Sequence, residues 1–256
     1  AHPFENPTPL TNFLEMLAIL MLPAALCYTF GLIVGNKRQG WVIFAAMLTL
    51  FLAGFALSWW AEAQPNPITH VPVNMEGKEQ RFGVMNSVLW STATTDASNG
   101  SVNAMHDSLS PLAGGVAMFN IMLGEIIFGG VGCGLYGMLM YVLVTVFIAG
   151  LMVGRTPEYL GKKIEAYEVR LAIIVLIVPS ALILIGAAIA HVYPPALLSL
   201  PHNGPHGYSA LVHAISFASA NNGSPFPRLT GRTPVHHYAR PIATRIPRSA
   251  HRVPAI

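Results

Sequence analysis

Residues 97–101 read Ala97-Ser98-Asn99-Gly100-Ser101, and residues 220–224 read Ala220-Asn221-Asn222-Gly223-Ser224. Each of these polar, glycine-containing segments follows a moderately apolar stretch that starts near Phe82-Gly83 or near His206-Gly207. A unit that recurs in a membrane protein usually reflects symmetry around a substrate path. The two stretches therefore predict two pore helices, each followed by a re-entrant loop.

A second pair of segments supports the repeat. Glu5-Asn6-Pro7-Thr8-Pro9-Leu10 aligns without gaps on Asp107-Ser108-Leu109-Ser110-Pro111-Leu112, and each precedes an apolar stretch that ends in a basic loop. The order within one unit is span, outer loop, half-length helix, polar glycine-bearing loop and second span. We expect an all-α, polytopic membrane protein built from pore-loop repeats, with the set of repeats incomplete.

The composition agrees with a membrane protein. Hydrophobic residues make up 53% of the chain and charged residues 10%, which is far from the usage of a soluble domain. The basic pI of about 9.0 comes from residues 225–256, which hold six Arg and no acid, whereas residues 1–224 hold eight Lys or Arg and eleven Asp or Glu. A nucleic-acid partner is therefore excluded. Cys27 and Cys133 lie in apolar stretches and read as small buried residues.

Four regions are long and apolar enough to cross a bilayer, which takes roughly 20 helical residues. They are residues 13–35, 41–60, 108–154 and 171–190. The third is too long for one straight crossing, and the glycine-rich run from Phe128 to Gly137 in its middle predicts a broken helix. Lys37 and Arg38 follow the first span, and the loop from Arg155 to Arg170 precedes the fourth, so the positive-inside rule places both loops in the cytoplasm.

These spans divide the chain into four parts. Residues 1–40 are expected to form the last span of a second repeat, and residues 41–170 a third repeat with its pore loop and broken span. Residues 171–224 would hold the first span and pore loop of a fourth repeat, followed by a Pro- and Arg-rich tail at 225–256. No start methionine opens the chain, so we expect a fragment of something longer.

The polar loops have the composition of a potassium filter. A dehydrated potassium ion needs a ring of oxygen dipoles, and backbone carbonyls supply them without a fixed charge. Turning carbonyls toward an axis needs backbone angles that Gly, and to a lesser degree Asn, tolerates. An ordinary Asn-Gly turn is the alternative for either loop alone, but recurrence favours the filter. The candidate filter residues are Thr95, Ser98, Asn99, Gly100, Ser101, Asn221, Asn222, Gly223 and Ser224.

Two charged residues, Glu125 and Arg155, are further candidates for a role in the ion path. Glu125 is an intramembrane carboxylate beside the glycine-rich break, where it either meets a cation or pairs with a neighbouring helix. Arg155 ends the broken span, where basic residues mostly obey the charge rule. The ten His show no metal-ligand spacing such as His-x-x-x-His on a helix, so we assign no metal other than potassium at the filter.

The run from Gly150 to Ile164, Gly-Leu-Met-Val-Gly-Arg-Thr-Pro-Glu-Tyr-Leu-Gly-Lys-Lys-Ile, resembles the cytoplasmic loop of the KdpA family. Four further segments resemble parts of the same family, and the resemblance covers residues 1–224. Residues 1–8 resemble the segment after its second filter, 124–132 its broken helix, 103–108 the segment after its third filter, and 221–224 its fourth filter.

The resemblance implies a pseudo-fourfold subunit in the bacterial inner membrane that binds and translocates potassium without hydrolysing ATP. Its implied partners are the P-type ATPase subunit KdpB and the accessory subunits KdpC and KdpF. Gly100 and Gly223 would be filter glycines, and the broken helix with Glu125, Gly129, Gly130, Gly132 and Arg155 would gate or divert the ion. The chain departs from the family pattern at Asp96 and Asn99, where smaller, uncharged residues are more usual.

The Pro- and Arg-rich tail does not fit the family pattern. After Ser224 the family continues with apolar residues, so residues 225–256 read as a slip of reading frame or as a basic disordered tail. Since a filter needs four quarters and the chain holds two loops, the isolated chain is expected not to conduct.

Three alternative functions remain open. One is an ion-coupled potassium transporter without an ATPase partner, and another is a defective truncation. The third is a lipid-linked transferase, for which the sequence shows no paired acids, metal cluster or nucleophile.

Overall fold

The computed structural model describes residues 4–65, 70, 72–124, 126–129, 134–197, 200, 202, 204–220 and 222. Its elements are α1 (Pro9–Ile33), α2 (Lys37–Ala63), α3 (Gly83–Ala97), the 3₁₀ helix η1 (His106–Ser108), α4 (Pro111–Met122), α5 (Gly134–Val153), β1 (Glu158–Tyr159), β2 (Lys162–Lys163), α6 (Ala166–Val192), α7 (Pro194–Leu197) and α8 (Pro205–Ser219). Four of them, α1, α2, α5 and α6, are long and apolar enough to span a membrane. The all-α, polytopic architecture is confirmed.

Helices α1 and α4 begin in the same way. Thr8 and Ser110 are their N-caps, each side chain accepts a hydrogen bond from the backbone N–H three residues on, and a proline occupies the first helical position. Proline suits that position because its missing N–H would have no partner inside the helix. The gapless alignment of residues 5–10 on 107–112 therefore matches two equivalent helix starts.

Helices α1 and α2 form a closely packed antiparallel pair. A β-carbon added at Gly40 would lie 2.5 Å from the carbonyl oxygen of Cys27, and one at Gly31 would lie 3.2 Å from the Cα of Gly40. The two backbones can approach this closely only because both positions are glycine. Cys27 of α1 and Met47 of α2 are both buried in the hydrophobic core.

The third span is broken, as the sequence predicts. Helix α4 ends at Met122 and α5 begins at Gly134, and between them Phe128 has a left-handed φ of 50°. The Phe128 ring is buried against two aromatic side chains of α2, with centroids 5.5 Å from Phe44 and 6.5 Å from Phe51. Packing of this ring anchors the non-helical connection to α2.

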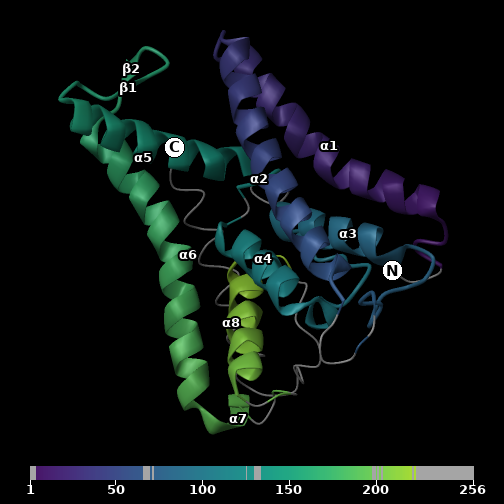
Figure 1. Ribbon diagram of the computed structural model, residues 1–256. Helices are drawn as coiled ribbons and strands as arrows, with labels where there is room; N and C mark the ends of the chain where they lie inside the picture. Colours follow the sequence, from purple (N-terminus) through teal and green to yellow (C-terminus); the bar gives the residue numbers. More distant parts are fainter. Residues whose placement is uncertain are drawn as a thin grey trace.

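The two basic loops lie at one end of the molecule. In Figure 1 the α1–α2 turn and the β1–β2 hairpin are both at the upper end, and α7 is at the opposite end. Strands β1 and β2 pair antiparallel, with Glu158 opposite Lys163. The positive-inside rule predicts that both basic loops lie on the same side of the membrane, and their position at one end of the molecule agrees with that. The β1–β2 hairpin itself was not predicted.

Candidate functional site

Helix α3 delivers the first polar loop. It starts at Gly83, where the sequence places the start of the pore helix, and it ends at Ala97. Ser98 then adopts a left-handed conformation with φ 57° and ψ 47°, and its N–H donates to the carbonyl oxygen of Thr94. This local turn leads the chain out of the helix directly into Asn99-Gly100.

The Asn99 side chain organises the loop that follows. Its Oδ1 accepts hydrogen bonds from Thr94 Oγ1 at 2.5 Å, from the Ser101 N–H at 3.0 Å and from Ser101 Oγ at 2.9 Å. The indole N–H of Trp90 donates to Ser101 Oγ at 3.0 Å. Gly100 has φ 81°, an angle that residues with a β-carbon rarely adopt. Asn99 and Gly100 thus play different roles, one bracing the loop and the other permitting its turn.

Two described residues of the second polar segment, Ala220 and Asn222, contact the end of α3. Helix α8 starts at Pro205, within two residues of the predicted start, and ends at Ser219. The Ser98 hydroxyl donates to the carbonyl oxygen of Ala220 at 2.6 Å, and Asn222 Nδ2 donates to the carbonyl oxygen of Thr94 at 2.6 Å. Segments more than 120 residues apart in the sequence therefore meet through a reciprocal pair of hydrogen bonds.

A polar cluster surrounds the end of α3. The Thr95 hydroxyl donates to the carbonyl oxygen of Ser91 at 2.8 Å and lies 3.5 Å from Asn120 Nδ2 on α4. Asp96 is buried with 1% of its surface exposed, and among the described residues neither of its carboxylate oxygens has a hydrogen-bond partner. The carboxyl end of a helix carries a partial negative charge, so the end of α3 favours a cation near this loop.

The chain leaving the loop is tied to the start of α1. Asn12 Oδ1 accepts hydrogen bonds from Asn103 Nδ2 at 2.6 Å and from Asn6 Nδ2 at 3.0 Å. The Arg81 guanidinium donates to the backbone oxygens of Asn6 and Pro7, each at 3.1 Å. The segment before α1, the segment before α3 and the loop after it are thereby held in one polar layer.

The candidate gate residues are only partly described. The Gly129 carbonyl oxygen accepts a hydrogen bond from the N–H of Gly134 at 2.9 Å across the helix break. Arg155 follows the carboxyl end of α5, is exposed, and donates its N–H to the carbonyl oxygen of Gly150 at 3.0 Å. The residues Glu125, Gly130, Gly132, Asn221, Gly223 and Ser224, with the tail 225–256, lie outside the described part of the chain.

Sequence reasoning missed several residues of this site. Asn120 carried a detectable signal, because a polar amide stands in an otherwise apolar span. Asn12 carried the same signal near the start of the first span. Trp90 and Asn103 gave none, since their roles depend on contacts made after folding.

Known proteins match the whole described region. The family described as KdpA, potassium-transporting ATPase A subunit, matches residues 1–255. That extent passes residue 224, where the resemblance noted from the sequence stopped. The slip of reading frame in residues 225–256 stays a prediction.

Curated relatives carry a matching name, "Potassium-transporting ATPase potassium-binding subunit". The chain is 55% identical to the protein of Rhodospirillum centenum over 262 residues, which cover 100% of the chain and 46% of the relative. It is 55% identical to that of Methylococcus capsulatus over 243 residues, with 93% and 41% covered, and 52% identical to that of Pseudomonas aeruginosa over 260 residues, with 100% and 46% covered.

The chain spans less than half the length of these relatives. The part of the chain that the structure describes holds four helices long and apolar enough to span a membrane, and together with its relatives they make it a multi-pass membrane protein. The match over residues 1–255 and the identities above 50% lead to one family. This chain belongs to the KdpA family, the A subunits of potassium-transporting ATPases.

Proposed function

We propose that this chain forms part of the potassium-binding subunit of an ATP-driven potassium importer in the bacterial inner membrane. The observation that carries the proposal is the contact between the loops after α3 and α8, through Ser98 with Ala220 and Asn222 with Thr94. Two re-entrant loops that meet after two 15-residue helices have the layout of two quarters of one ion filter.

The ion would be coordinated mainly by backbone oxygens. Carbonyl groups replace the hydration shell of potassium only if the surrounding chain holds them in place. The hydrogen bonds of Asn99 with Thr94 and Ser101 supply that support in the first polar loop, and Gly100 permits the turn. The proposed filter comprises Thr95, Ser98, Asn99, Gly100, Ser101, Asn221, Asn222, Gly223 and Ser224.

The remaining parts of the subunit follow from this assignment. Residues 1–40 would belong to a second repeat, 41–170 to a third and 171–224 to a fourth. The broken helix with Glu125, Gly129, Gly130 and Gly132 would gate the ion below the filter, and Arg155 would close its cytoplasmic end. The partners would be KdpB, which hydrolyses ATP, together with KdpC and KdpF, so this subunit itself would not be catalytic.

An ion-coupled transporter without an ATPase partner is the second candidate, because it would share the pore-loop repeat. The names of the relatives favour the ATPase subunit. Since the chain holds two of four expected loops, we propose that it does not conduct alone. Selective potassium flux through liposomes that contain only this chain would contradict that part of the proposal.

A chimera tests the function. Residues 1–224 would replace the matching segment of the Rhodospirillum centenum relative, and rubidium uptake would be measured in bacteria lacking other potassium importers. We expect uptake that requires the co-expressed ATPase subunits. Gly100→Ala should weaken apparent rubidium affinity about tenfold, because a β-carbon in a left-handed turn costs about 1–2 kcal/mol. Gly115→Ala is the control, since a β-carbon there meets nothing within 4 Å.

Two results would overturn the proposal. Uptake that continues without the ATPase subunits would favour the ion-coupled transporter. Unchanged affinity and ion selectivity in Gly100→Ala, at equal protein levels, would exclude the first polar loop from the ion path.

A further inference from the structure

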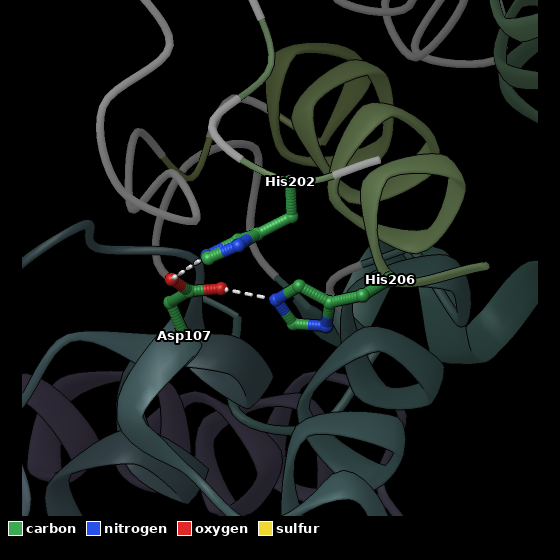
Figure 2. Close-up of side chains that lie close together, drawn as sticks. All are labelled: Asp107, His202 and His206. Carbon is green, nitrogen blue, oxygen red and sulfur yellow. Dashed lines mark hydrogen bonds and ion pairs between the residues drawn. The ribbon is translucent and has the colours of Figure 1, made fainter. Parts of the chain in front are cut away.

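Three side chains of types that can bind a metal ion meet at the end of the molecule near α7, away from the polar loop contact. Asp107 lies in η1, His202 lies in the segment before α8, and His206 lies in the first turn of α8. Figure 2 shows both imidazole rings turned toward the two carboxylate oxygens of Asp107. From these residues we propose a binding site for a divalent transition-metal ion of the zinc class.

The distances suit a single ion. His206 Nε2 lies 2.8 Å from Asp107 Oδ1, His202 Nε2 lies 3.6 Å from Asp107 Oδ2, and the three candidate ligand atoms lie within 4.8 Å of one another. Zinc binds imidazole nitrogen and carboxylate oxygen at about 2.0–2.2 Å, so two ligands of one ion can be about 4 Å apart or less. Small rotations of the imidazole rings, whose side chains are 51% exposed, would close the remaining gap.

The donor set selects the metal. Two imidazoles and one carboxylate are ligands that zinc and its neighbours accept, whereas calcium and magnesium prefer oxygen alone. The exposed rings leave the fourth coordination position open to water. Potassium, the ion assigned to the loops, is not the ion that imidazole nitrogen favours.

A hydrogen bond between Asp107 and His206 alone would leave the second histidine unexplained. His202 and His206 have ring centroids 4.8 Å apart, and Nε2 of each ring faces a different oxygen of the same Asp107 carboxylate. A divalent cation between the two rings and the carboxylate would draw all three ligand atoms toward one point. Among the described residues no Lys or Arg forms an ion pair with Asp107.

The three residues connect the segments next to the two polar loops. Asp107 lies a few residues after the first polar loop, and His206 opens the helix that leads to the second. Behind them, His106 packs edge-on against His213 of α8 with ring centroids 5.7 Å apart. A metal bound here would therefore fasten α8 to η1 and hold the two loops in register.

This site differs from the expectation that no histidine pair has ligand spacing. His202 and His206 do stand four residues apart, but α8 begins only at Pro205, so they do not share a helix face. The third ligand, Asp107, lies 95 residues earlier in the chain, and nothing in the sequence links it to them.

Metal titration of the full 256-residue chain in lipid nanodiscs tests the proposal. Zinc binding would be measured by calorimetry, and cobalt binding by its visible absorption. The variants are Asp107→Asn, His202→Gln, His206→Gln and their combination, and His191→Gln is the matched control because it is exposed and outside the cluster. Loss of a supporting group already costs about 10- to 100-fold in metal affinity, so each single ligand variant should lose at least tenfold.

We expect wild type and His191→Gln to bind one zinc ion more than the triple variant does. The same binding in the triple variant and wild type would overturn the proposal, as would tight zinc binding in His202→Gln. His202 lies outside the helices, so its substitution leaves the fold testable even if His206→Gln unfolds α8. Circular dichroism of each variant separates loss of the site from loss of the helices.

Discussion

The Lys78 ammonium lies 2.9 Å from a carboxylate oxygen of Glu62, and both side chains are fully excluded from solvent. Glu62 also accepts a hydrogen bond from Asn74 Nδ2 at 2.9 Å and another from the N–H of Ser110, the N-cap of α4. Lys78 Nζ donates to the Ser108 carbonyl oxygen at 3.2 Å. This buried pair joins the end of α2 and the loop before α3 to the start of α4.

Removing one partner of this pair should be strongly destabilising. Glu62→Gln or Lys78→Met leaves a buried charge without its counter-charge, which costs about 3–5 kcal/mol of unfolding free energy. The double variant should recover part of that loss, because no isolated charge remains. Denaturant unfolding in mixed micelles, followed by circular dichroism, measures these differences.

The exposed pair of Arg81 and Glu79 provides the control. Their side chains are 32% and 37% exposed, and exposed ion pairs contribute about 1 kcal/mol or less. Glu79→Gln should therefore change stability little. Equal losses for Glu62→Gln and Glu79→Gln would contradict the role given to the buried pair.

A β-carbon at Gly40 should separate α1 from α2. Gly40→Ala places an atom 2.5 Å from the Cys27 carbonyl oxygen, and overpacking of this kind costs about 1–3 kcal/mol. Gly115→Ala adds the same atom in α4, where nothing lies within 4 Å, and should be neutral or slightly stabilising. The free energy of unfolding of the two variants is the measurement, and a neutral Gly40→Ala would refute the close crossing.

The contact between the polar loops should protect α8. Asn222→Leu removes the donor to the Thr94 carbonyl oxygen and should cost about 1–3 kcal/mol, because the new side chain is buried among polar groups. Amide hydrogen exchange should speed up in residues 214–220 of that variant. Ser209→Ala, which removes a hydroxyl that donates to the Pro205 carbonyl oxygen in the first turn of α8, should leave the exchange unchanged.

The helix break offers a test of backbone strain. Phe128→Ala removes a buried ring and should cost about 3–5 kcal/mol. Phe128→Gly removes as much packing, but glycine accepts the left-handed φ of 50° that alanine resists. The glycine variant should therefore be more stable than the alanine variant by about 1 kcal/mol. The reverse order in thermal unfolding would contradict the left-handed backbone at this position.

Local patterns in the sequence predicted most of the helices. The starts of α3 and α8 and the break between Met122 and Gly134 all depend on residues close together in the chain. Hydropathy, capping residues and glycine encode such features directly. The amino-acid sequence alone is therefore enough to place these elements.

Contacts between distant segments could not be predicted in this way. The Glu62–Lys78 pair reads as two loop charges in the sequence, and Asp107 gives no sign of its two histidines. The reciprocal bonds of Ser98 and Asn222 depend on how α3 and α8 pack, which neither periodicity nor composition specifies. The recurrence of the polar segments located the candidate loops in the sequence. It did not indicate which residues form hydrogen bonds with them.

Chemical cross-linking measures the contact between the two loops most directly. Ser98→Cys and Ala220→Cys would be combined in a chain with Cys27→Ala and Cys133→Ala, joined in nanodiscs by a short bifunctional thiol reagent and cut with trypsin at exposed Lys162 or Lys163. The two halves should stay together until the reagent is cleaved by reduction. A control pair, Ser98→Cys with Ile174→Cys, should release separate halves. Release of separate halves from the Ser98–Ala220 pair, with both cysteines reactive, would contradict a shared ion path.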